Sequence, residues 1–129
     1  MIKLENCDSE KNIMSDSGQQ RNMLVIRYDG VNKIIPLEEI LYIESQNHKV
    51  ILHKKEGSLE FYARIGDLEK ELQGRFFRIH KGYLINLMFV DKYSRTEATL
   101  ENNDRLPISK YRYNDFVNAY LQFMEQRER

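Results

Sequence analysis

The sequence has little cysteine, no long apolar run and no excess of charge of either sign. Cys7 is its single cysteine, so no disulfide can form within the chain. Disulfides are rare in reducing compartments, and we therefore expect a cytoplasmic protein. No apolar run approaches the roughly 20 residues that a membrane-spanning helix needs. Residues 1–12 are polar and carry both charges, which is not the composition of a signal peptide.

The formal net charge is zero, with 20 Lys and Arg against 20 Asp and Glu. A nucleic-acid-binding protein usually has a clear basic excess, so this balance counts against a uniformly basic binder. A neutral chain can still bind DNA if its basic groups lie together on one face. The placement of those groups in the fold therefore decides the question.

Catalytic and metal-binding motifs are also missing. The histidines, His48, His53 and His80, and the distant Cys7 do not have the spacing of zinc ligands. The chain contains no P-loop, no G-x-G-x-x-G and no G-x-S-x-G nucleophile motif. We therefore expect no enzyme, no bound metal and no cofactor.

The chain divides into a tail and one domain. Residues 1–22 contain few apolar side chains and follow neither a helix nor a strand period, so we expect a flexible N-terminal tail. Residues 23–129 have the length of one domain. Asp29-Gly30 lies between two β-rich runs and predicts a hairpin, because both central residues of a type I′ turn need positive φ.

The rest of the domain is also predicted to be mostly β. Further strands are expected at 41–45, 50–53 and 59–65, at both ends of 76–90, and in a hairpin of 93–100 with 105–109. One helical turn should follow Pro36, and a short helix with Asp67 as its cap should span 66–74. Apolar residues at helical spacing predict a C-terminal helix over 113–126. The pattern gives seven to ten strands in small packed sheets, two short helices and this C-terminal helix.

Three polar segments are candidate binding sites, and each also has an ordinary structural explanation. His48 and Lys49 interrupt two strand halves, where they would contact guanine N7 and O6 in a major groove or simply form an exposed turn. His80 and Lys81 precede a glycine, where they would contact a phosphate or occupy a structural bulge. Residues 109–112 would either place Lys and Arg on DNA or cap the last helix through Ser109.

The order of these segments resembles the LytTR DNA-binding domain of bacterial response regulators. Residues 35–45 followed by His48-Lys49-Val50 resemble its opening, and 77–86 (FRIHKGYLIN) resemble its central signature. Residues 106–110 (LPISK) resemble its third block, and the likeness covers about 23–123. Within the family, the segments LEFY (59–62) and FFR (76–78) lean toward the agr-type regulators.

The resemblance implies about ten strands and a sequence-specific transcriptional regulator that binds promoter direct repeats. Loops at one edge would enter successive grooves of double-stranded DNA. The implied contacts are His48 with Lys49 in one major groove, Lys81 beside His80 at the backbone or minor groove, and Lys110 with Arg112 in the next major groove. The family also suggests dimers on DNA and a regulatory protein partner.

Two departures from the agr-type pattern affect this expectation. Those relatives carry Asn at the position of Lys81 and Arg at the position of Lys110. A lysine lacks the planar fork through which arginine donates two hydrogen bonds to one guanine. We therefore expect a looser or different base preference at this half of the site. Residues 1–22 are also too few for a receiver domain, which leaves a stand-alone regulator or an excised output domain.

A function of another class competes with DNA binding. A LytTR-like fold could bind a regulator protein through exposed Tyr and Phe, and the neutral net charge favours this alternative. Retention on heparin or bulk DNA at low salt would distinguish the two.

Overall fold

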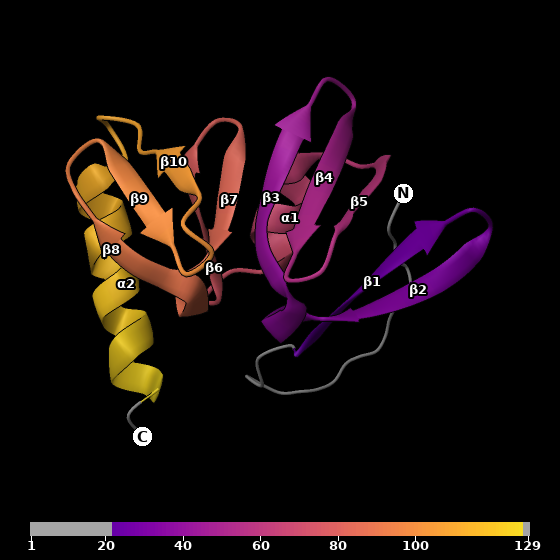
Figure 1. Ribbon diagram of the computed structural model, residues 1–129, viewed down its shortest axis with the longest axis horizontal. Helices are drawn as coiled ribbons and strands as arrows, with labels where there is room; N and C mark the ends of the chain where they lie inside the picture. The colour runs from indigo at the N-terminus through magenta and orange to yellow at the C-terminus, as the bar shows by residue number, and fades with distance from the viewer. Residues whose placement is uncertain (1–21, 128–129) are drawn as a thin grey trace.

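The computed structural model describes residues 22–127, which form ten strands and two α-helices (Figure 1). Residues 1–21, and with them nearly all of the expected tail, lie outside the described part. The strands are β1 (Met23–Tyr28), β2 (Val31–Pro36), β3 (Ile40–Gln46), β4 (Lys49–Lys54), β5 (Ser58–Tyr62), β6 (Phe76–His80), β7 (Tyr83–Asn86), β8 (Val90–Tyr93), β9 (Glu97–Leu100) and β10 (Arg105–Pro107). The helices are α1 (Ile65–Glu71) and α2 (Tyr113–Arg127), with 3₁₀ turns η2 (Leu37–Glu39) and η3 (Leu87–Phe89). Within the described range, no helix combines the length and apolar character needed to cross a membrane.

The strands form three small antiparallel sheets, which confirms the predicted fold class. The orders are β1-β2, β5-β4-β3-β7-β6 and β10-β9-β8. In Figure 1 the five-stranded sheet lies in the middle, with the β1–β2 hairpin on one side and the three-stranded sheet with α2 on the other.

The five-stranded sheet is covered on both faces, which gives the domain two cores. Ile43 and Leu84 face the core shared with the β1–β2 hairpin and α1. Their neighbours Tyr42 and Ile85 face the core shared with the three-stranded sheet and α2. Successive strand residues point to opposite faces, so a strand buried on both sides has a continuous apolar run.

The first hairpin forms as its sequence predicts. Asp29 and Gly30 have φ of 54° and 79°, the positive values that a type I′ turn requires at both positions. Asn22, the last residue of the expected tail, accepts a hydrogen bond from the Leu37 amide at 2.9 Å.

Two local predictions are wrong. Asp67 does not cap α1, because the helix begins earlier, after Arg64, and Ile65 is buried in its first turn. The expected strand over 93–100 is interrupted at 94–96, where the Ser94 amide donates to the Glu97 carbonyl at 2.8 Å and turns β8 back into β9.

Asn86, the last residue of β7, links the segment before β3 to the segment after β7 through its side chain. Its buried side-chain amide donates to the carbonyls of Leu37 at 3.0 Å and Ile40 at 2.9 Å, which are the first residue of η2 and the residue that follows it. Its side-chain oxygen accepts the amide of Met88 at 3.0 Å and caps η3. One asparagine thus satisfies three backbone groups where β3 and β7 meet their 3₁₀ turns.

We predict that Asn86→Leu destabilises the domain by about 3 kcal/mol, because it leaves buried backbone groups without partners. Denaturant unfolding followed by circular dichroism measures the loss. The matched control is Asn118→Leu on the exposed side of α2, which should change stability by no more than about 0.5 kcal/mol. Equal effects of the two substitutions would contradict this role for Asn86.

Candidate nucleic-acid interface

Three turns from distant parts of the chain meet at one edge of the fold. They are residues 47–48 between β3 and β4, 81–82 between β6 and β7, and 109–112 between β10 and α2; we call them the loop edge. All three lie at the top of Figure 1. The Ser45 amide donates to the Gly82 carbonyl at 2.9 Å, and the Ser109 amide donates to the Ile79 carbonyl at 2.7 Å. Hydrogen bonds therefore join the 81–82 turn to β3 just before the 47–48 turn, and the 109–112 loop to β6 just before the 81–82 turn.

The 47–48 turn presents His48 to solvent. Asn47 adopts a positive φ of 60°, a conformation that asparagine tolerates better than most residues, and this reverses the chain within two residues. His48 is exposed at the tip of the turn. The sequence therefore builds a tight, protruding turn that can enter a groove.

Lys49 lies beside His48 but is engaged within the sheet. Its Nζ lies 3.1 Å from a carboxylate oxygen of Glu60 on β5 and 5.6 Å from the ring centre of Tyr62. The hydrogen bond to Glu60, together with its negative charge, raises the pKa of the Lys49 ammonium. Lys49 therefore stays protonated, and a DNA phosphate would compete with Glu60 for it.

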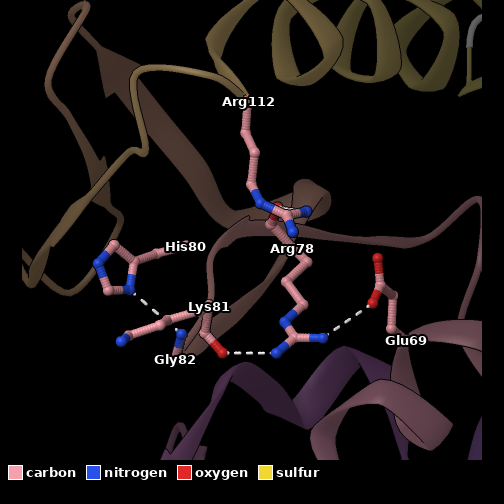
Figure 2. Close-up of polar contacts among 6 residues, drawn as sticks. All are labelled: Glu69, Arg78, His80, Lys81, Gly82 and Arg112. Atoms are coloured by element: carbon pink, nitrogen blue, oxygen red, sulfur yellow. Dashed lines mark hydrogen bonds and ion pairs between the residues drawn. The ribbon is translucent and has the colours of Figure 1, made fainter.

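The 81–82 turn exposes Lys81 and fixes the ring of His80. The Gly82 amide donates to Nδ1 of His80 at 3.1 Å, as Figure 2 shows. An amide can only donate, so Nδ1 carries no proton and the neutral ring carries its proton on Nε2. The irregularity expected near Gly82 lies slightly earlier, between Arg78 and His80 in β6.

The 109–112 loop divides its two basic residues between solvent and protein. Lys110 is exposed, with its Nζ 5.9 Å from the ring centre of Tyr111. Arg112 instead reaches back to β6, where its Nη1 donates to the carbonyl of Arg78 at 3.3 Å (Figure 2). Ser109 lies four residues before the start of α2, and its amide and carbonyl carry the loop's backbone hydrogen bonds.

The loop edge carries more positive charge than the zero net charge of the whole chain suggests. Within residues 22–127, Lys81 and Lys110 form no ion pair, whereas Lys49 is paired with Glu60.

No group of three or more His, Cys, Asp or Glu among these residues is arranged to hold a metal ion.

Arg95 is a candidate that the sequence interpretation missed. The 94–96 turn sits beside the loop edge, because the Ile108 amide donates to the Thr96 carbonyl at 2.8 Å. The Arg95 guanidinium lies 5.0 Å from the ring centre of Tyr113 at the start of α2. The sequence feature that could have indicated this turn is the polar triplet Ser-Arg-Thr at 94–96, inside the expected strand. Tyr111, 87% exposed between Lys110 and Arg112, was not singled out either.

A comparison with known families identifies the domain. The family model of the LytTR DNA-binding domain matches residues 31–120. The chain belongs to the LytTR DNA-binding domain family. This confirms the resemblance and makes the protein a DNA-binding regulator in general terms.

A solved structure supports the same fold for this LytTR domain. It is the LytTr DNA-binding domain of a protein described as a methyl-accepting/DNA response regulator from Bacillus cereus. The TM-score is 0.63 at 17% sequence identity, over 78% of this chain and 97% of that one. A comparison with curated protein sequences gave no match.

The geometry of the 81–82 turn predicts one tautomer for His80. In the neutral ring, long-range ¹H–¹⁵N NMR should find the proton on Nε2, because Nδ1 accepts the Gly82 amide. His48 is the internal control, since its exposed ring has no such hydrogen bond within the described residues and should sample both tautomers. A protonated Nδ1 in neutral His80 would refute the assignment.

Proposed function

We propose that this LytTR domain is a sequence-specific transcriptional regulator that recognises direct repeats in promoter DNA through the loop edge. The observation that carries the proposal is the convergence of the segments around His48, Lys81 and Lys110, joined by the Ser45–Gly82 and Ser109–Ile79 hydrogen bonds. A β scaffold that holds three exposed turns in a row can place them on one side of a duplex.

The spacing of the two hairpin turns suits a groove and its wall. Strand order places the centre of the β3–β4 turn two strand spacings from the centre of the β7–β6 turn, about 10 Å. The major groove of B-DNA is about 12 Å wide. With His48 inside a major groove, Lys81 therefore comes to lie over the adjoining phosphate backbone.

The side chains then divide into two roles. His48 and Lys110 read base edges, since a His or Lys donor can bind guanine N7 and O6. Lys49, Lys81 and the Nε2–H of His80 contact phosphates and set the register, which carries no sequence information by itself. Arg112 holds the 109–112 loop against β6, because its guanidinium donates a hydrogen bond to the Arg78 carbonyl.

We predict that His48→Ala and Lys110→Ala each weaken binding to the specific site by about 1–3 kcal/mol, while binding to random DNA barely changes. The protein's preferred site is first enriched from a random pool, where paired direct repeats should emerge. Mobility shifts on that site and on random DNA then measure both affinities.

The matched control for these variants is Lys55→Ala. Lys55 follows β4 at the end opposite Lys49, where it packs over Phe89 with its Nζ 4.9 Å from the ring centre. Its loss should leave the ratio of specific to random affinity unchanged. Equal losses on both DNAs for His48→Ala would rule out base reading by this residue.

Salt dependence separates this function from a protein-interaction module. If the loop edge neutralises phosphates, log K should fall with log salt by about 0.9 for each phosphate. The protein should also bind heparin at low salt. Elution in the void volume, together with no enrichment of any DNA from the pool, would favour the protein-interaction alternative.

A further inference from the structure

Arg78 on β6 joins three elements that the DNA interface needs. Its Nη1 donates to a carboxylate oxygen of Glu69 on α1 at 3.1 Å, and its Nη2 donates to the Lys81 carbonyl at 2.6 Å. Its own carbonyl accepts the Arg112 guanidinium at 3.3 Å. Figure 2 shows this chain of contacts from α1 through Arg78 to the 81–82 turn and the 109–112 loop.

We propose that Arg78 is a positioning residue that fixes the 81–82 turn against α1 and does not itself contact DNA. This inference rests on the proposed DNA-binding function of the loop edge. It adds α1, through Glu69, to the set of elements that determine DNA affinity, although α1 carries none of the expected contacts.

The state of the guanidinium supports a positioning role. The side chain is 19% exposed, and both of its terminal nitrogens are already used within the protein. Its Nε is buried without a hydrogen-bond partner. A buried unpaired donor is costly, so the contacts to Glu69 and Lys81 have to compensate for it. A phosphate ligand would instead keep its guanidinium free at the surface.

The contact to the Lys81 carbonyl is what links Arg78 to the interface. The 81–82 turn consists of two residues, so holding one carbonyl fixes the plane of the peptide between Lys81 and Gly82. That same glycine donates to His80 and accepts from Ser45. Loss of the Arg78 side chain therefore loosens the turn, and the Lys81 side chain no longer keeps one direction.

Salt dependence of DNA binding distinguishes positioning from phosphate contact. For Arg78→Met we expect about a tenfold loss of affinity for the enriched site, with a change of less than about 0.5 in the slope of log K against log salt. Arg78→Lys should show a similar loss, because an ammonium lacks the planar fork that bridges a carboxylate and a carbonyl. A slope reduced by about one in Arg78→Met, with affinity restored by Arg78→Lys, would overturn the proposal.

The control for lost charge is Arg127→Met. Arg127 lies in the last turn of α2, at the far end of the helix from Lys110. Its replacement by Met should therefore leave the affinity for the specific site unchanged. Hydrogen exchange in the free protein adds a readout that a DNA contact would not affect. In Arg78→Met the Gly82 amide should exchange at least about tenfold faster than in the unmodified protein, and unchanged exchange would overturn the proposal.

Glu69→Gln keeps the test valid if the Arg78 variants do not fold. Glu69 is 38% exposed, so its replacement should leave the domain folded. If Arg78 positions the turn, Glu69→Gln lowers the ratio of specific to random affinity and speeds exchange of the Gly82 amide. A ratio and an exchange rate equal to those of the unmodified protein would refute the bridge.

Failure of the proposed function would look different. In that case the unmodified domain would enrich no DNA site, whereas exchange at Gly82 would still respond to Arg78→Met and Glu69→Gln. A domain that enriches a site but shows no response to either variant would refute the role of Arg78 alone.

Discussion

The antiparallel pairing of β3 with β7 is the constraint on which the binding edge depends. Each strand belongs to its own hairpin, and the register Glu44 with Tyr83 places the end of β3 beside the start of β7. The turns that follow β3 and precede β7 must therefore emerge at the same end of the sheet. A parallel arrangement of these two strands would have put His48 and Lys81 at opposite ends.

The third turn joins this edge through the second core. Phe116 of α2 is fully buried against β6 and the three-stranded sheet, with its ring centre 5.9 Å from that of Phe77. Because that packing fixes the start of α2, the loop before it is brought over β6, where Ser109 and Arg112 bond to the strand's carbonyls. Apolar burial thus positions a polar surface that contributes little to stability itself.

Local patterns in the sequence predict the hairpins but not how they associate. Asp29-Gly30 specifies its turn through the φ values that it tolerates, and the helical spacing in α2 is equally local. The break at 94–96 was missed because no glycine or proline marks it, and only pairing of Tyr93 with Ala98 makes a turn necessary there. The cap of α1 was misplaced by three residues, at Asp67 instead of Arg64, since burial of Ile65 sets where that helix begins.

The same limit applies to the site. Sequence blocks identify His48, Lys81 and Lys110 as candidates, but their meeting depends on pairing between residues some 30 to 40 positions apart, such as Glu44 with Tyr83. Nothing in the pattern indicates that Arg112 points back to β6 or that Lys49 pairs with Glu60. Those contacts depend on which side chains become neighbours once the sheets are packed.

The neutral net charge also has a local explanation. Two carboxylates near the interface form ion pairs with basic side chains, Glu60 with Lys49 and Glu69 with Arg78. Lys81 and Lys110 thus present unpaired charge within the described residues, while the rest of the surface remains balanced. A field confined to one edge weakens long-range attraction to DNA and leaves more of the affinity to contacts made within the grooves. In a lysine-based interface, where no arginine fork fixes the geometry at Lys110, selectivity depends on how firmly each turn is held, and the hydrogen bonds beneath the loop edge provide that rigidity.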